Sequence, residues 1–498
     1  MDNKIFQDHV EWEVLYPEEI ITNLTFEKGV YNINKDCIIR FTRDNKYDLI
    51  ASISGILNDS ESIDPNYKEG AFVSGDIIIG YSQNGLFKYI FSGALLGKNK
   101  RSLIAPNSTS VKFEAELRVD GVSRIFNDSD LETEYLHEWY LSGGTDNMFF
   151  PRITSRSIHE SYKREREGID PKDEFGLIKS SSSSGDYLFV KYADTSFIVS
   201  KVPKEFGSDW SFSLCIEYRA SFGRIPDNNE RIAISELVGF LMGNQLLKIG
   251  ETTFDKSHSL IVQKYIDPIG DNIETRCQRI SFPPVLIKGH QNRQNLEILI
   301  GNFLPLYLKQ REALQLKNVL GKYWFSKYSA IGVNLPILSS AIETLANCIL
   351  KANKQIKHSY IDYNEFVKLI EGDLASIKMK LGDNIFSDKI INKIKGVSQR
   401  GSNEKLAMVF EFLNLSVGKI ENEAIKQRNK MAHSSLDEET DEEIHEIVRL
   451  SRAFETLFNR MLLRVLSYDG LCIDYYTPGH PQRNIKEAIP EINIPTQQ

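Results

Sequence analysis

An arginine, an asparagine and a histidine stand close together in the C-terminal third of the sequence, at Arg428, Asn429 and His433. The ordinary pKa of histidine lies near neutrality, so the imidazole can accept the proton of a ribose 2′-hydroxyl. Arginine stays cationic, and its planar set of N–H donors fits phosphate oxygens and can neutralise charge that develops on phosphorus. Asn429 adds an uncharged donor that can orient the phosphate. These residue types suit cleavage of RNA by its own 2′-hydroxyl, which needs no metal ion and excludes DNA as a substrate.

The spacing of Arg428 and His433 limits how their side chains can meet. Five residues at about 100° each place them about 140° apart around an ideal helix, so they would not share one face. Both can reach one site if the helix ends there, and Ser434 and Ser435 offer such an end. A second subunit related by a two-fold axis is the other way to complete the pocket. Taken alone, this spacing is common, and a surface arginine beside a helix-capping histidine is the ordinary interpretation.

The elements that must position these residues are helices. Residues 304–329 carry two apolar stripes at helical spacing, and Pro336 suits the first turn of a helix from Ile337 to about Lys354. The sequences Ser435-x-x-Glu438 and Thr440-x-x-Glu443 have the form of capping boxes at the start of the last helix. Further helices are predicted at 364–381, 387–396, 403–417, 419–432 and 440–467.

The first 290 or so residues are predicted to form mainly strands. Residues 111–119 and 212–218 alternate apolar and polar side chains, as half-buried strands do. One helix is predicted from Glu230 to Met242, and the charged stretch 152–185, which ends in five serines, is predicted to be an exposed loop. The fold class is therefore a multidomain α+β chain, with a β-rich domain over residues 1–300 and an all-α bundle over residues 301–498.

Composition favours a soluble cytoplasmic protein. The start of the chain lacks the apolar region of a signal peptide, and no apolar run approaches the ~20 residues of a membrane span, so no membrane partner is expected. The net charge of −8 argues against a protein coated in positive charge for general nucleic-acid binding. Five widely separated cysteines speak against a zinc ribbon or a disulfide framework and fit a reducing compartment: Cys37, Cys215, Cys277, Cys348 and Cys472.

A local excess of positive charge lies within this acidic chain. Residues 351–400 contain nine lysines and one arginine against six acidic residues, a difference of +4. This excess can serve as a surface that guides RNA. Lysines on the outer faces of helices are also ordinary, and that alternative stays open.

The stretch from Arg428 to His433 (RNKMAH) resembles the R-N-x-x-x-H motif that defines HEPN domains. Its position near the end of one long helix, directly before the final long helix, is also similar. The segment from Leu338 to Leu350, with Glu343 on an otherwise apolar helix, resembles the first core helix of that fold. The resemblance covers roughly residues 305–470. A β-rich domain of this size before such a module resembles the ApeA family of bacterial anti-phage defence proteins.

The resemblance implies a metal-independent endoribonuclease without a cofactor, in which two motifs meet at the composite cleft of a homodimer or higher homo-oligomer. It makes Arg428 and His433 the catalytic pair and Asn429 the polar residue beside them. Glu343 is a candidate partner of Arg428, with a solvated rim carboxylate as the alternative. The products would carry a 2′,3′-cyclic phosphate and a 5′-hydroxyl.

The ApeA resemblance further implies abortive infection, with an N-terminal domain that senses a phage component and a nuclease that cleaves host RNA, tRNA above all. Two other interpretations stay open. One is a non-catalytic HEPN module that only dimerises or binds RNA. The other is a sugar- or peptide-binding β-sandwich protein whose helical part is an assembly element.

Overall fold

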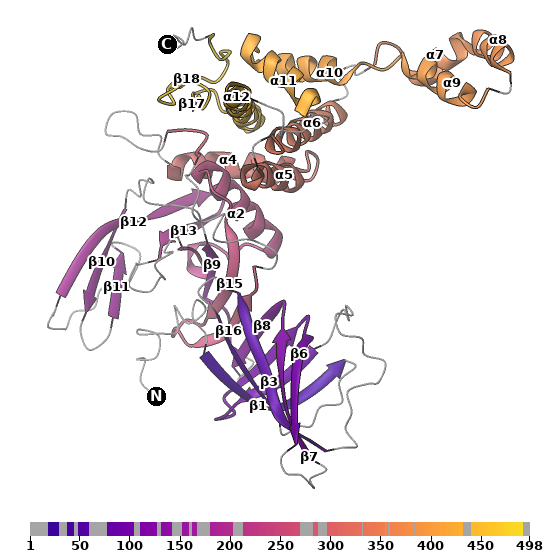
Figure 1. Cartoon of the computed structure of the whole chain (residues 1–498). Coiled ribbons are helices and arrows are strands. Elements are labelled where there is room, and N and C mark those ends of the chain that lie inside the picture. The colour runs from indigo at the N-terminus through magenta and orange to yellow at the C-terminus, as the bar shows by residue number, and fades with distance from the viewer. Residues whose placement is uncertain are drawn as a thin grey trace. The chain divides into compact units, whose positions relative to one another are not determined.

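The structure is a computed structural model of the whole chain, and Figure 1 shows its elements. It describes residues 18–28, 37–43, 48–58, 77–103, 110–126, 131–141, 152–158, 162–166, 180–202, 213–268, 282–286, 296–330, 332–353, 355–356, 359–382, 384–431 and 440–491. The chain divides into two compact units. The first comprises residues 1–235, 244–282 and 295–302, and the second comprises residues 236–243, 283–294 and 303–498. The division passes through two helices, α2 (Asn228–Met242) and α4 (Leu296–Gln310).

The first unit contains a large antiparallel sheet, and every pairing between its described strands is antiparallel. The strand order is β11-β10-β12-β13-β14-β9-β15-β16-β8-β5-β4-β1-β2-β3-β7-β6. The strands are β1 (Glu18–Lys28), β2 (Ile38–Arg43), β3 (Leu49–Asn58), β4 (Ile77–Ser82), β5 (Phe87–Ser92), β6 (Leu95–Leu103), β7 (Ser110–Arg118), β8 (Gly121–Phe126), β9 (Tyr135–Leu141), β10 (Arg152–Ile158), β11 (Tyr162–Arg166), β12 (Ser180–Tyr192), β13 (Thr195–Lys201), β14 (Ser213–Arg219), β15 (Leu247–Phe254) and β16 (Leu260–Ile266).

One apolar core joins strands that are far apart in this order. The ring of Phe41 on β2 packs edge to face on that of Tyr265 on β16, with centroids 5.3 Å apart, although four strands separate β2 from β16. The same cluster includes Trp139 on β9 and Cys215 on β14. The sheet must therefore curl around its own apolar face, which buries the alternating side chains that the sequence predicted for β7. The half-buried strand predicted at 212–218 is wrong in its burial, because residues 214–219 of β14 are buried on both faces.

The loop predicted at 152–185 is wrong for the residues that the structure describes there, and residues 159–161 and 167–179 lie outside them. Residues 152–158 and 162–166 form β10 and β11, and the serine run begins β12. Arg156 pairs with Ser182 across β10 and β12. Charged and hydroxyl side chains hid these strands from the sequence pattern, because a ladder of backbone hydrogen bonds does not require apolar side chains.

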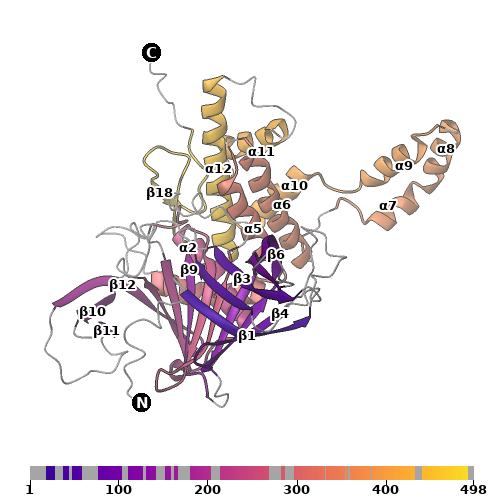
Figure 2. The same cartoon turned by 60° about the horizontal axis from the view of Figure 1, so that its bottom comes forward.

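The second unit is helical. Besides the ends of α2 and α4, it contains α5 (Leu316–Tyr328), α6 (Asn334–Ala352), α7 (Tyr363–Leu369), α8 (Glu371–Leu381), α9 (Ser387–Gly396), α10 (Ser402–Phe412), α11 (Lys419–Met431) and α12 (Asp441–Val465), followed by a small hairpin of β17 (Leu471–Ile473) and β18 (Gln482–Asn484). Helices α5, α10, α11 and α12 all pack on α6 (Figures 1 and 2). The fold is thus mixed, with a large antiparallel sheet in the N-terminal part and helices in the C-terminal part.

Helix α6 is the one described helix that is long and apolar enough to cross a membrane. Such a helix needs ~20 mostly apolar residues, and the core helix of a bundle meets the same requirement. Of its apolar stretch, 56% is buried inside the protein. Leu338, Ile342 and Leu345 are among its buried side chains. Their burial is what a central helix with four helical neighbours requires.

Candidate functional site

The predicted catalytic residues fall on and after α11. Arg428 and Asn429 lie in the last turn and a half of this helix, where residues 428–431 are described by their backbone alone. His433 and the serines that follow it lie outside the described residues. Glu343 lies on α6, half-buried. Because α11 packs on α6 and on α12, the structure brings together the two helices that carry Arg428 and Glu343.

The start of α11 is fixed by an ion pair inside the bundle. Glu421 is 0% exposed, and its carboxylate accepts a hydrogen bond from Nη1 of Arg460 on α12 at 2.9 Å. It also accepts the backbone N–H groups of Gly418 and Ile489, at 3.0 and 2.9 Å. Burial lowers the pKa of Arg460, and the adjacent Glu421 carboxylate opposes that effect. Every polar atom of the carboxylate is thereby matched, as a buried charge requires.

Arg460 extends this anchor to the segments on either side of α11. Its Nε donates to the carbonyl of Ile485, and its Nη2 donates to the carbonyl of Ser416, both at 2.7 Å. One guanidinium therefore joins α12, the turn before α11 and the segment after β18. The helix that carries Arg428 is held at its first turn, seven residues before the motif.

The register of α11 assigns its motif positions to two faces. Glu421, Ala424 and Ile425 are buried, and position 428 follows them at the i+7, i+4 and i+3 spacing of one helix face. Asn422 and Lys426 are exposed, and position 429 continues their stripe in the same way. Adjacent motif positions thus continue a buried face and an exposed face of α11.

The element after the motif begins as predicted. Thr440 is the N-cap of α12, and its Oγ1 accepts the backbone N–H of Glu443 while the Glu443 carboxylate accepts the backbone N–H of Thr440. This capping box is confirmed, and the one predicted at Ser435-x-x-Glu438 lies outside the described residues. Asp441, Glu442 and Glu443 fill the first turn, where carboxylates favour the helix dipole.

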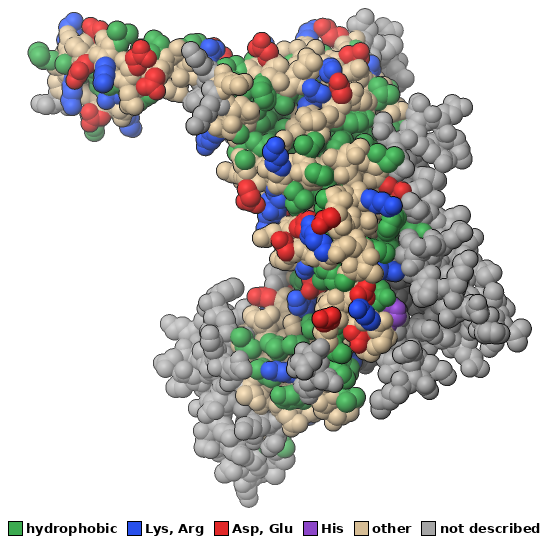
Figure 3. Space-filling view, turned by 180° about the vertical axis from the view of Figure 1, so that it is seen from behind, with side chains coloured by type: hydrophobic (Ala, Val, Ile, Leu, Met, Phe, Trp, Pro, Cys, Tyr) green, Lys and Arg blue, Asp and Glu red, His purple; other side chains and the backbone are tan. Residues whose placement is uncertain are grey.

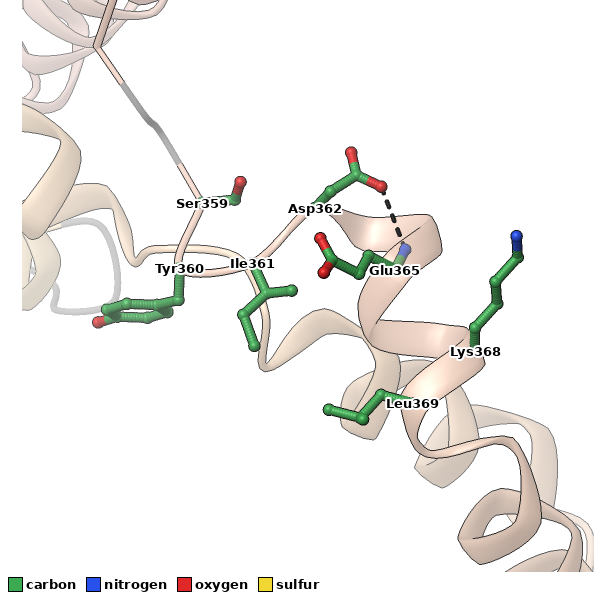
Figure 4. A pocket seen from close by; sticks show the side chains of 7 residues that line it. All are labelled: Ser359, Tyr360, Ile361, Asp362, Glu365, Lys368 and Leu369. Carbon is green, nitrogen blue, oxygen red and sulfur yellow. Dashed lines mark hydrogen bonds between the residues drawn. The ribbon is translucent and has the colours of Figure 1, made fainter.

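A hollow of about 810 Å³ lies where the chain enters α7 (Figure 4). Tyr360, Ile361 and Leu369 supply its apolar side chains, and Lys368 is its one cation. The Asp362 carboxylate caps α7 by accepting the backbone N–H of Glu365 at 3.2 Å. This hollow has the chemistry of a helix start.

The lysine excess predicted as an RNA-guiding surface falls largely on α7, α8 and α9, which pack mainly on one another. On the face that Figure 3 shows, apolar, basic and acidic side chains are interspersed on this lobe. Lys378, for example, lies 3.8 Å from the carboxylate of Asp388. That face is mixed in charge, which fits the ordinary interpretation of its lysines.

A second hollow adjoins the motif helix and was missed in the sequence. This groove, of about 440 Å³, lies between α10 and α11 and is lined by Asn403, Ala407, Phe410, Glu411, Leu415, Val417, Asn422, Ile425 and Lys426. Its apolar members come from both helices and the turn between them, and apolar residues of a predicted bundle are ordinarily assigned to its core. Two of its polar residues, Asn422 and Lys426, were the available signal, because they share a helical stripe with position 429.

Comparison with models of known protein families, with curated proteins and with solved structures finds no match for this chain. Among the residues that the structure describes, no group of three or more histidine, cysteine, aspartate or glutamate side chains is arranged to hold a metal ion.

Proposed function

We propose that this chain is a metal-independent endoribonuclease of the HEPN type, with Arg428 and His433 acting on the scissile phosphate and Asn429 orienting it. One observation carries the proposal. Arg428 and Asn429 lie at the end of α11, in a helical bundle, and His433 follows them in the sequence before the long, capped α12. The packing of α11 on α6, the helix of Glu343, supports it further.

The proposed reaction is a transesterification within the RNA. The imidazole of His433 takes the proton of the ribose 2′-hydroxyl, and the 2′ oxygen forms a bond to phosphorus. The bond from phosphorus to the 5′ oxygen of the next nucleotide breaks, and that oxygen takes up a proton. The Arg428 guanidinium stabilises the charge on the phosphoryl oxygens, and Glu343 is the candidate carboxylate that orients it. The products are a 2′,3′-cyclic phosphate and a 5′-hydroxyl.

The proposal includes a setting for this activity. The β-rich N-terminal part would act as an ApeA-like sensor of a phage component, and host RNA, tRNA foremost, would be cleaved in abortive infection. The enzyme would work in the cytoplasm, as a homodimer or higher homo-oligomer, without a cofactor.

Sequencing of RNA ends in infected bacteria tests the proposal. Cells that express the wild-type chain should gain new 5′-hydroxyl ends and stop growing. Arg428→Ala and His433→Ala should each lower cleavage by about 10²–10⁴-fold, the usual contribution of one acid–base or charge-stabilising group. His445→Ala, which removes an exposed histidine of α12, is the matched control and should cleave like the wild type. Equal behaviour of all four chains would favour a non-catalytic interaction module.

A further inference from the structure

We infer that the groove between α10 and α11 binds a nucleobase of the RNA, next to the phosphate that is cut. The inference rests on the proposed function, and it adds a contact to a base of the RNA beside the proposed contacts to the phosphate. The first support for it is the position of the groove relative to Arg428. The α11 residues of the groove precede Arg428 by two to six residues, which is roughly 3 to 9 Å along the helix axis. A nucleotide that flanks a phosphate bound at Arg428 can reach this distance.

The floor of the groove is suited to the flat face of a base. Phe410, Leu415 and Ile425 are only 5–6% exposed and form this floor. The turn that supplies Leu415 is tight, because the N–H of Leu415 donates to the carbonyl of Phe410 at 2.8 Å and Asn414 has a φ of 54°. An apolar floor fixed by the backbone does not have to reorganise on binding. Contact with a base on such a surface does not depend on sequence, since every base has an apolar face.

The rim of the groove can read the edge of that base and hold the RNA backbone. The side-chain amide of Asn422 donates to the carbonyl of Gly418 at 2.8 Å, which fixes its orientation, and its side-chain oxygen can accept a hydrogen bond. The carboxylate of Glu411 offers acceptors for exocyclic amines. Lys426, exposed and in the same stripe as Asn429, is placed to meet a phosphate. An apolar floor with a few polar groups around it is the usual form of a small-molecule site.

A short peptide is the competing occupant, and the position of the groove beside the motif argues against it. An apolar floor with Glu411 and Lys426 on opposite helices would accept a peptide, but Lys426 shares its face of α11 with position 429, where the proposed phosphate binds. The stripe of Asn422 and Lys426 on the rim of the groove reaches position 429 at helical spacing. A stripe of this kind selects a ligand that carries both a base and a phosphate.

Filling the groove tests the inference directly. Ala407 is an exposed groove residue of α10, so Ala407→Trp places a bulky ring in the groove without removing buried apolar surface. RNA binding is measured by fluorescence anisotropy on the full chain carrying His433→Ala, with labelled single-stranded RNA and bulk bacterial tRNA as probes. Ala407→Trp should weaken binding by about tenfold or more, the order expected for the loss of one base contact. In the cleaving chain it should raise KM more than it lowers kcat.

Two rim variants and one control complete the experiment. Asn422→Ala should change the preference among RNAs that differ in one base, and Lys426→Ala should weaken binding to all of them and reduce the salt slope by about one ion. Lys419→Ala removes an exposed lysine from the first turn of the same helix, where it pairs with Glu491, and should bind like the parent chain. Circular dichroism shows whether Ala407→Trp is folded.

The outcomes separate this inference from the proposed function. Loss of RNA binding in Ala407→Trp and Lys426→Ala, with Lys419→Ala unchanged, supports the groove even if the wild-type chain cuts no RNA. If the chain cleaves RNA and neither Ala407→Trp nor Lys426→Ala changes its KM, the assignment of the groove as a base site is overturned. The proposed nuclease activity is then still supported. RNA binding that is equal in all chains also overturns it.

Discussion

The proposed site depends on one fully buried residue, Glu421. Its carboxylate ties the motif helix α11 to α12 and to the C-terminal segment. A buried charge with all its partners is costly to disturb, because removal of one partner leaves the other uncompensated. Lys419 and Glu491 form an exposed ion pair, at 3.0 Å, between α11 and the C-terminal segment. Exposed pairs of this kind contribute ~0–1 kcal/mol.

Glu421→Gln should therefore lower the free energy of unfolding by about 3–5 kcal/mol, because the Arg460 guanidinium stays buried without its counter-charge. Lys419→Ala, the matched control, should change it by less than about 1 kcal/mol. Urea unfolding followed by the helical circular dichroism signal gives both values. Similar shifts for the two variants would contradict the assignment of Glu421 as the anchor of α11.

In the first unit, the ionisation of Asp267 affects the stability of the fold. Burial, with a smaller contribution from nearby Asp48, raises the pKa of Asp267 to about 6. In the unfolded chain this carboxyl titrates near 3.9. The folded state therefore holds the proton more tightly, and ionisation of Asp267 removes stability as the pH rises from about 4 to about 6.

Asp267→Asn should remove this loss. The thermal midpoint of the variant, relative to the wild type, should rise between pH 4.5 and pH 7 in scanning calorimetry. Asp48→Asn should lower the pKa of Asp267, because one like charge is removed, and the loss of stability should then occur at lower pH. A constant difference between wild type and Asp267→Asn across this pH range would contradict a raised pKa.

Among the elements, the lobe of α7, α8 and α9 is joined to the bundle by two paired segments. Ser359 and Gln399 form an antiparallel bridge, and the N–H of Tyr360 donates to the carbonyl of Ser398 at 2.9 Å. The two ends of the lobe therefore lie side by side. Its own buried apolar side chains among the described residues are Leu374 and Ile391.

Replacement of residues 361–397 by a short glycine-serine loop should therefore leave the bundle folded. A short loop can close the gap because bridged residues in an antiparallel pair have Cα atoms only about 4.5–5.5 Å apart. Circular dichroism and thermal unfolding should show fewer helical residues and a transition that persists. Aggregation or loss of the transition would show that the bundle needs the lobe.

Helical periodicity predicted most of the bundle, and its failures have local causes. The helix predicted at 387–396 has those bounds in α9. The helix predicted at 364–381 is two helices, because the backbone at Ile370 leaves the helical conformation (φ −106°, ψ 15°), and no proline marks that break. The helix predicted at 403–417 ends at Phe412, before Asn414 in the left-handed region.

The candidate site was predictable only in its outline. The motif and its place between two helices follow from residue types and capping chemistry. The groove does not, because Phe410, Leu415 and Ile425 are apolar residues of three successive segments, and only the packing of those segments shows that they leave a hollow. The Glu421–Arg460 pair, 39 residues apart in sequence, was equally hidden, since nothing local distinguishes a buried ion from a solvated one.

For the whole molecule, the 140° between Arg428 and His433 on an ideal helix leads to a prediction about assembly. If the two side chains meet across a two-fold axis, each site takes its arginine from one subunit and its histidine from the other. A dimer of one Arg428→Ala chain and one His433→Ala chain then contains one intact site and one site that lacks both groups. If each site is formed within one subunit, the same mixed dimer has no intact site.

Equal amounts of the two inactive chains, unfolded and refolded together, should therefore recover cleavage. Random pairing makes half of the dimers mixed, each with one of two sites intact, so activity should reach about a quarter of the wild-type value. Each variant refolded alone is the control and should stay inactive. Release of 5′-hydroxyl ends from bulk tRNA is the measurement. Failure to recover activity, with mixed dimers shown by differently tagged chains, would assign Arg428 and His433 to one subunit, which agrees with the end of α11 at Met431, between the two positions.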